Sequence, residues 1–124
     1  MKKALLSIHP EYVREILNTK KQYEYRKREF SKEVRCILIY ETAPTKMIVA
    51  EAEVRGTIVG SPREVWRITK DASGISERAF FEYYNGYNTA IAYALGNIHK
   101  FERPRTLDEY GINRAPQSFV YISE

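Results

Sequence analysis

Apolar and polar positions alternate in short blocks along this chain of 124 residues, each block with the period of a strand or a helix. The apolar run Ala4–Ile8 predicts a first strand. Pro10 suits the first turn of a helix, because proline has no amide proton to leave unpaired there. Polar residues and tyrosines then alternate over Gln22–Arg26, which predicts a strand with its tyrosines facing the core. The nearly continuous apolar stretch Val34–Tyr40 predicts a central strand covered on both faces.

The middle of the chain predicts a long strand followed by two helices. Met47–Val59 alternates small apolar residues with charged ones, which is typical of a strand with one face in water. Ser61 and Glu64 have the spacing of a capping box and begin the first helix, whose apolar surface includes Ile68. The second helix is expected over Ser76–Tyr84.

The tyrosines around this second helix are expected to divide between core and surface. Its inward stripe is predicted at Ala79, Phe80 and Tyr83. Tyr84 and Tyr87 flank an Asn-Gly turn and are expected to be exposed, where their rings can stack on a nucleic-acid base.

The remaining pattern completes an α+β fold. It predicts a strand over Thr89–Leu95 extended by Ile98–Phe101, a helical turn capped by Thr106 and Glu109, and a last strand within Ala115–Ile122. Because strands and helices follow in an irregular order, we expect a mixed sheet curled into a small β-barrel with short helices outside it. No repeat or linker interrupts the pattern, so residues 1–124 are expected to form one domain.

Composition narrows the class of protein. Hydrophobic residues make up 44% of the chain and charged residues 29%, which is typical of a globular domain. No apolar run reaches the ~20 residues that span a bilayer, and the N-terminal run is too short for a secretory signal, so we expect a cytoplasmic protein without membrane contact. With Cys36, His9 and His99 as the only cysteine and histidines, the sequence indicates no disulfide, metal site or other cofactor.

Positive charge is concentrated in one segment. The net charge is +4, and the rest of the chain is balanced once the segment Lys20–Arg35 is set aside. Its seven basic residues are Lys20, Lys21, Arg26, Lys27, Arg28, Lys32 and Arg35. A local basic patch is typical of a surface that meets phosphates, although a solvated loop of mixed charge has the same composition.

The most informative residues of this segment are Lys21, Glu24 and Arg26. If the tyrosines of the strand face the core, Glu24 and Arg26 share the opposite face, where the guanidinium holds the carboxylate ionised. Lys21 is out of phase with them and joins that face only if the preceding turn rotates it. Together the three offer donors and an acceptor to a base edge or an anion, and the alternative is a salt-bridge ladder on the surface.

The spacing Lys21-x-x-Glu24-x-Arg26 after a short helix resembles the G-x-K-x-x-E-x-R signature of the ASCH domain, a member of the PUA-like superfamily. Other segments support the resemblance over nearly the whole chain: Ile8-His9-Pro10, Ile39–Pro44, Gly60-Ser61-Pro62 and Pro116–Phe119. The signature glycine falls on Thr19, so a turn that needs a positive φ would be strained there.

The resemblance implies a helix-flanked β-barrel with a cleft that binds RNA or a modified nucleotide, in RNA processing, modified-base recognition or transcription regulation. Its ligand-binding residues would be Lys21, Glu24 and Arg26, with Thr42, Gln117 and Ser118 at the border. Phosphate contacts would come from Lys27, Arg28, Lys32 and Arg35, which give affinity rather than sequence choice.

Two alternatives remain open. A subset of small ASCH proteins hydrolyses N4-acetylcytidine with a Lys, a Thr and a Glu, and this chain resembles that subset at Lys21 but has Glu24 at the threonine position and no glutamate near Asp71–Ser73. As a nucleoside amidohydrolase it would use Glu24 as general base, with Lys21 or Arg26 stabilising the oxyanion. The second alternative is an adaptor that contacts proteins. The sequence does not determine the oligomeric state.

Overall fold

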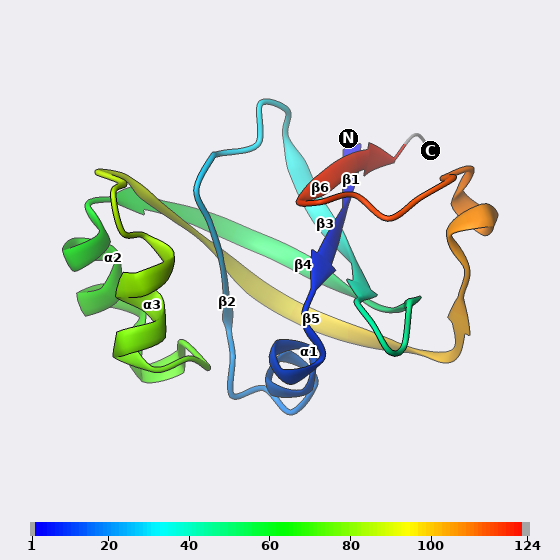
Figure 1. The fold of residues 1–124 in the computed structure, drawn as a ribbon, viewed down its shortest axis with the longest axis horizontal. Coiled ribbons are helices and arrows are strands. Elements are labelled where there is room, and N and C mark those ends of the chain that lie inside the picture. The colour runs from blue at the N-terminus through cyan, green and yellow to red at the C-terminus, as the bar shows by residue number, and fades with distance from the viewer. Residues whose placement is uncertain (1, 123–124) are drawn as a thin grey trace.

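The observed order of strands and helices is the one that the sequence predicts. The computed structural model describes residues 2–122. In chain order the elements are β1 (Lys2–Ile8), α1 (Pro10–Leu17), β2 (Tyr23–Arg26), β3 (Val34–Glu41), β4 (Met47–Gly60), α2 (Pro62–Thr69), the 3-10 helix η1 (Lys70–Ala72), α3 (Glu77–Tyr83), β5 (Ala90–Arg105), the 3-10 helix η2 (Leu107–Tyr110) and β6 (Phe119–Ile122) (Figure 1).

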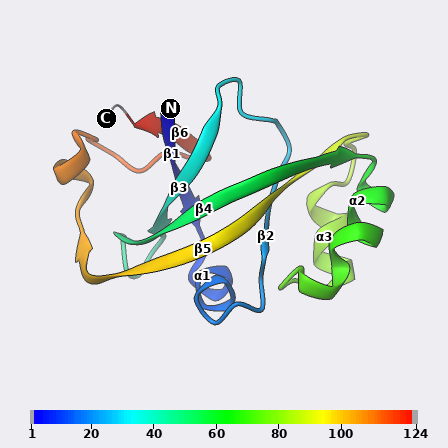
Figure 2. The ribbon, with the colours of Figure 1, turned by 180° about the vertical axis from the view of Figure 1, so that it is seen from behind.

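The strands form one mixed sheet in the order β2-β5-β4-β3-β1-β6. Among the strands of residues 2–122, only β1 and β3 pair in parallel, and the long strands β4 and β5 cross the whole molecule side by side (Figure 2). The α+β class is therefore confirmed. The sheet is barrel-like but not a closed barrel, because in the described part of the chain β2 and β6 remain its two edges and are not paired with each other.

Aromatic side chains bridge part of the gap between these two edges. Phe30, just after β2, stacks on Tyr93 of β5 with ring centroids 4.4 Å apart and meets Phe119 of β6 edge-on at 4.9 Å. The backbone N–H of Phe30 donates to the Tyr93 hydroxyl, and that of Ser31 donates to the Tyr121 hydroxyl of β6. Side-chain packing and these hydrogen bonds therefore connect the two edge strands where backbone pairing is absent.

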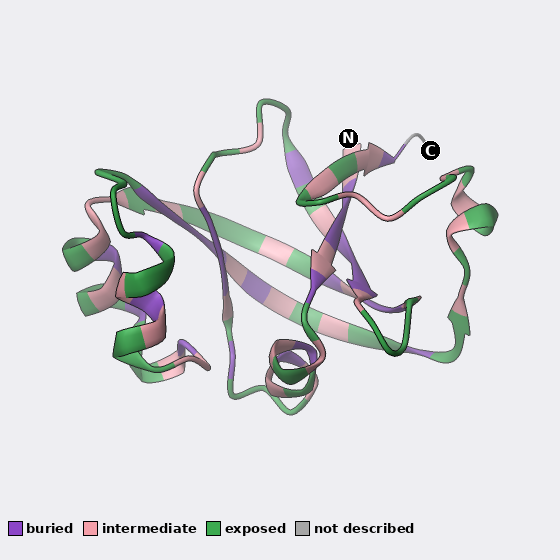
Figure 3. Ribbon diagram, in the orientation of Figure 1, coloured by how far each residue is buried: buried purple, intermediate pink, exposed green. Residues whose placement is uncertain are grey.

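The helices cover the sheet in two places. α1 buries Val13 and Ile16 against β1 and β3, as its apolar spacing predicts. α2 and α3 lie together over one end of the β4–β5 pair, where Val65 and Phe80 are buried (Figure 3). The predicted capping box of α2 is present, with Ser61 accepting from the Glu64 backbone and Glu64 accepting from the Ser61 backbone.

Ile68, part of the predicted apolar surface of α2, is half-exposed. One expectation about α3 is wrong. Tyr84 is 2% exposed, whereas Tyr83 is 39% exposed, the reverse of the prediction. Phe80 and Tyr84 are four residues apart, so they lie on one face, and their rings pack at 4.9 Å to form the inward stripe of α3.

No helix within residues 2–122 is long and apolar enough to cross a membrane.

Candidate functional site

A tight turn after α1 places Lys21. Thr19 adopts φ +66, the left-handed conformation that the missing signature glycine predicts. For a residue with a side chain this costs roughly 1–2 kcal/mol. The turn is held by long-range bonds, since the Gln22 N–H donates to the Ala72 carbonyl at 2.8 Å. The turn rotates Lys21 toward Glu24 and Arg26. Without this rotation the three residues would not form one cluster.

The Lys21 side chain is buried under the loop that follows η1. The residue is only 4% exposed, and its Nζ donates to the Ser73 carbonyl at 3.2 Å. The ammonium also lies over two rings, 4.6 Å from the centroid of Tyr25 and 5.5 Å from that of Tyr12. Burial lowers the pKa of Lys21, and the negative charge of Glu24 opposes that shift. An amine in this setting has a proton that is easier to release than that of a surface lysine.

Glu24 is held by Arg26 on the same face of β2. One carboxylate oxygen, Oε2, accepts from Nη2 of Arg26 at 2.8 Å and from its Nε at 3.1 Å. The other oxygen, Oε1, has no hydrogen-bond partner among residues 2–122, and it is not sealed from solvent. Both residues are buried, so a salt-bridge ladder on the surface is not what the strand forms.

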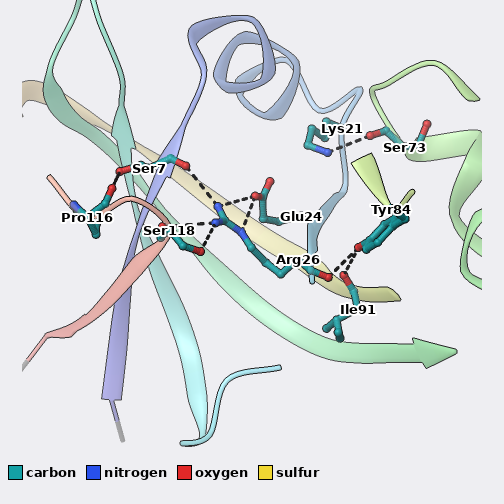
Figure 4. A network of polar contacts seen from close by, with 9 residues as sticks. All are labelled: Ser7, Lys21, Glu24, Arg26, Ser73, Tyr84, Ile91, Pro116 and Ser118. Carbon is teal, nitrogen blue, oxygen red and sulfur yellow. Dashed lines mark hydrogen bonds and ion pairs between the residues drawn. The ribbon is translucent and has the colours of Figure 1, made fainter. Parts of the chain in front are cut away.

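Arg26 is fully engaged by the protein. Beyond Glu24, its Nη1 donates to the Oγ and carbonyl of Ser118 at 3.1 and 3.4 Å, and its Nη2 donates to the Ser7 carbonyl at 3.4 Å (Figure 4). These bonds tie β2 to β1 and to the segment before β6, across the open side of the sheet. Because each guanidinium nitrogen already has a partner, Arg26 positions Glu24 and leaves Lys21 and Glu24 as the groups with capacity for a ligand.

Lys21, Glu24 and Arg26 line one cleft of about 550 Å³. This volume is within the range of roughly 300–1,000 Å³ found for small-molecule sites. The other lining residues are Ser7, Ile8, His9, Tyr12, Tyr25, Lys27, Ile75, Ala79, Tyr83, Gln117 and Ser118. The cleft therefore lies between α1, β2, α3 and the segment that leads into β6.

The residues expected at the border are only partly there. Gln117 and Ser118 line the cleft, whereas Thr42 does not and instead lies beside it, its hydroxyl 3.4 Å from Nδ1 of His9. Of the four residues expected to contact phosphates, Lys27 alone lines the cleft. Arg28, Lys32 and Arg35 are exposed outside it.

Three tyrosines of the cleft, Tyr12, Tyr25 and Tyr83, were not among the expected site residues, and Tyr25 was expected in the core. Tyr12 projects from α1, and Tyr83 projects from α3. Tyr83 lies three residues after Phe80 and Tyr84 lies four after it, so the helical period allows either tyrosine to share the buried face, and the spacing gives no signal for Tyr83 in the cleft. Tyr12 has no sequence signal either, since only the packing of α1 against the turn brings it beside Lys21.

The cleft contains one carboxylate, that of Glu24. Asp71 is exposed, and the Ser73 hydroxyl donates to the Ile75 carbonyl at 3.0 Å, so the loop that covers Lys21 adds no second acid. Residues 2–122 contain no group of three histidine, cysteine or acidic side chains placed to hold a metal ion.

A second depression, of about 840 Å³, lies over the outer face of α3. It is lined by Glu77, Arg78, Phe81, Glu82 and Asn85, and Arg78 and Glu82 pair with each other there. Although this depression is larger, its side chains come from one helix and its neighbouring turn. The cleft of Lys21 is the better candidate because groups from distant segments converge in it.

Comparisons with known proteins connect this geometry to a family. The profile of the ASCH domain matches residues 6–105. Large ribosomal subunit protein uL22 of Ureaplasma parvum is 31% identical over 86 residues, which are 69% of this chain and 28% of that protein, so the chain spans about a quarter of this relative. A Zymomonas mobilis protein called ASCH domain-containing ribonuclease is 29% identical over 126 residues, which are 98% of this chain and 84% of that protein.

Solved structures agree with the sequence comparisons. The crystal structure of ASCH from Zymomonas mobilis matches with a TM-score of 0.89 at 28% identity, covering 99% of this chain and 89% of that one. A mutant of the same protein matches with a TM-score of 0.90 at 27% identity, covering 100% of this chain and 92% of that one. The similarity in fold therefore extends over the whole cleft.

Proposed function

This chain belongs to the ASCH domain family, and from that premise we propose that it binds single-stranded RNA by taking an unpaired base into the cleft of Lys21 and Glu24. The relative from Zymomonas mobilis that is similar over nearly its full length is named a ribonuclease, which favours RNA as the class of ligand.

One observation carries the proposal. Within the described residues 2–122, a buried ammonium with a single hydrogen-bond partner and a buried carboxylate with one free oxygen face the same cleft. A base edge offers acceptors to Lys21 and donors to Glu24, and it satisfies both groups at once. The base must be unpaired, because in a duplex its edge is occupied and the major groove of A-form RNA is too narrow for side chains.

The surroundings of the cleft fit an RNA strand rather than a free base alone. Lys27 lines the cleft and brings a positive charge to it. Lys20 and Arg28 are exposed on the same segment and add to the charge that attracts phosphates. Tyr12 and Tyr83 add aromatic surface against which a base packs.

The test compares two neighbouring lysines. Fluorescence anisotropy with a labelled single-stranded RNA is measured at increasing salt for the wild type, Lys21→Met and Lys20→Met. Both substitutions remove one positive charge, but only Lys21 lies in the cleft. We expect wild-type affinity to fall with salt and Lys21→Met to weaken binding at least tenfold more than Lys20→Met.

Two results would contradict the proposal. One is an absence of RNA binding by the wild type at low salt. The other is an equal effect of the two substitutions, which would indicate that the charge of the segment acts without the cleft. Thermal unfolding of each variant confirms that it is folded, and Lys21→Met is expected to fold because it removes a buried charge without changing the length of the side chain greatly.

RNA cleavage is the second candidate function, favoured by the lowered pKa of Lys21 beside the carboxylate of Glu24. In this reaction Glu24 accepts the proton of a ribose 2′-hydroxyl, whose oxygen attacks the adjacent phosphorus. The bond to the 5′-oxygen breaks, and Lys21 donates a proton to that leaving oxygen. The products are a 2′,3′-cyclic phosphate and a 5′-hydroxyl end.

A single 2′-deoxy substitution tests this chemistry. We expect Glu24→Gln to abolish cleavage, and a deoxyribose at the cleaved position to abolish it in the wild type without preventing binding. Cleavage of the all-deoxy strand would exclude the mechanism. Incubation of the wild type and Glu24→Gln with N4-acetylcytidine tests the amidohydrolase prediction, in which Glu24 is the general base and Lys21 or Arg26 stabilises the oxyanion.

A further inference from the structure

Two exposed tyrosines beside the cleft share one lysine. Tyr83 is 39% exposed and Tyr87 is 45% exposed. Nζ of Lys27 lies 4.5 Å from the ring centroid of Tyr83 and 4.7 Å from that of Tyr87. A cation over an aromatic ring at this distance is favourable, and both partners remain accessible to solvent. The arrangement places an aromatic face and a positive charge together at the surface.

The buried ring of Tyr84 holds this arrangement in place. The Tyr84 hydroxyl donates to the Arg26 carbonyl at 2.8 Å and to the Ile91 carbonyl at 3.2 Å. Tyr83 packs edge-on against the same ring at 4.8 Å, and the Tyr87 N–H donates to the Tyr84 carbonyl at 2.9 Å. The ring of Tyr83 and the backbone of Tyr87 are therefore held in place before any ligand arrives, which reduces the entropy lost on binding.

The position of these residues relative to the cleft suggests an order. Tyr83 and Lys27 line the cleft, whereas Tyr87 lies outside its lining. Moving outward from Lys21, a strand of RNA meets Lys27 and then Tyr87. Successive nucleotides of an RNA present the same sequence of groups: a base, a phosphate and the next base.

We propose that Lys27 and Tyr87 form a second nucleotide subsite, in which Tyr87 stacks the base next to the one in the cleft and Lys27 pairs with the phosphate between them. This inference rests on the proposed function, since it requires a base in the cleft. Stacking on a tyrosine tolerates any base, so the second subsite adds affinity and length preference without sequence choice.

Calorimetric titrations with short nucleotides test the subsite. The probes are the nucleoside 3′- and 5′-monophosphates and the corresponding dinucleotides, with 2′-O-methyl on the first sugar to prevent cleavage. Because the phosphate is present in both sets, the difference in affinity reports the second base. We expect wild-type protein to bind dinucleotides roughly 5- to 150-fold more tightly than mononucleotides, the factor that one stacked base supplies.

Three variants and one control show which residues supply the gain in affinity. Tyr87→Ala is expected to bring dinucleotide affinity down to the mononucleotide level and to leave mononucleotide affinity unchanged, whereas Tyr87→Phe keeps the gain. Ile68→Ala, an exposed position on α2, is the control that changes neither. Lys27→Gln is expected to reduce the salt dependence of dinucleotide binding by about 0.7 in the logarithmic slope, the value for one phosphate contact on a single strand.

The outcomes separate this inference from the proposed function. If wild-type protein binds mononucleotides and gains nothing from the second base, or if Tyr87→Ala retains the gain, the subsite is wrong and the cleft remains. If Tyr87→Ala also weakens mononucleotide binding, Tyr87 belongs to the first site and the subsite is again wrong. If the wild type binds neither set of probes, the proposed function fails and the subsite fails with it.

Discussion

Replacing Gly74 with alanine should displace Lys21 from the cleft. Gly74 lies against the turn after α1, with φ +67. A Cβ built at this glycine would stand 2.3 Å from Cβ of Lys21 and 2.8 Å from its Cα. Carbon atoms in contact are separated by about 3.5–4.0 Å, so one of the two segments must move by roughly an ångström or more. Rotation of the lysine side chain does not relieve the contact, because backbone and Cβ atoms make it.

The expected loss of stability has two parts. Alanine in the left-handed region costs roughly 1–2 kcal/mol. Overpacking a closed contact costs roughly 1–3 kcal/mol more. Gly74→Ala should therefore lower the free energy of unfolding by about 2–5 kcal/mol, measured by urea unfolding with the fluorescence of Trp66, the single tryptophan. RNA affinity should fall as well, because the backbone that carries Lys21 has moved.

Gly111→Ala is the matched control. Gly111 follows η2 with φ +72, and nothing lies within 4 Å of the Cβ that alanine would add there. It should lose only the roughly 1–2 kcal/mol of the backbone conformation and keep its RNA affinity. Equal destabilisation of the two variants would refute the packing argument. A destabilised Gly74→Ala protein with wild-type RNA affinity would refute the link between this glycine and the position of Lys21.

Two further predictions concern the strand β2. Arg26→Met leaves the buried Glu24 carboxylate without its partner and should lower the free energy of unfolding by roughly 3–5 kcal/mol. Adding Glu24→Gln should restore at least about 1 kcal/mol of this loss, measured by urea unfolding. If the costs of the two substitutions simply add, the coupling between the two side chains is contradicted. Burial raises the pKa of Tyr25 to about 12, although its hydrogen bond to Thr69 opposes the shift. The tyrosine of the unfolded chain loses its proton first, near pH 10. The contribution of Tyr25 to the free energy of unfolding is therefore present below pH 10 and is lost as the pH rises toward 12. Between pH 8 and 11 the free energy of unfolding of the wild type should fall by about 1.4 kcal/mol more than that of Tyr25→Phe. Parallel pH profiles of the two free energies would show that Tyr25 has no such role.

Much of the fold was predictable because its signals are local. The strands appear as runs or alternations of apolar residues, and the capping box of Ser61 and Glu64 marks the start of α2 by residue spacing alone. The left-handed turn at Thr19 was also predictable, because the resemblance placed a glycine there. The strands and the cap depend on neighbours within a few residues, and packing elsewhere in the chain did not override them.

The exposed tyrosines show where local signals fail. Tyr83 and Tyr84 are adjacent, and both lie within reach of the inward stripe of α3. Which of them is buried depends on the rotation of the helix, and the bonds of the Tyr84 hydroxyl to the carbonyls of Arg26 and Ile91 hold the buried arrangement. Those acceptors are 58 and 7 residues away in sequence, on strands that α3 covers.

The sequence by itself determined the order of elements, the concentration of positive charge in one segment, and the candidates Lys21, Glu24 and Arg26. Tertiary structure decided their roles. Arg26 became a positioning residue through Ser118, 92 residues away, and Lys21 entered the cleft beneath Ser73, 52 residues away. Periodicity and caps reflect interactions within a segment and between that segment and water. Whether a side chain can bind a ligand depends instead on which distant groups already occupy its hydrogen-bonding positions.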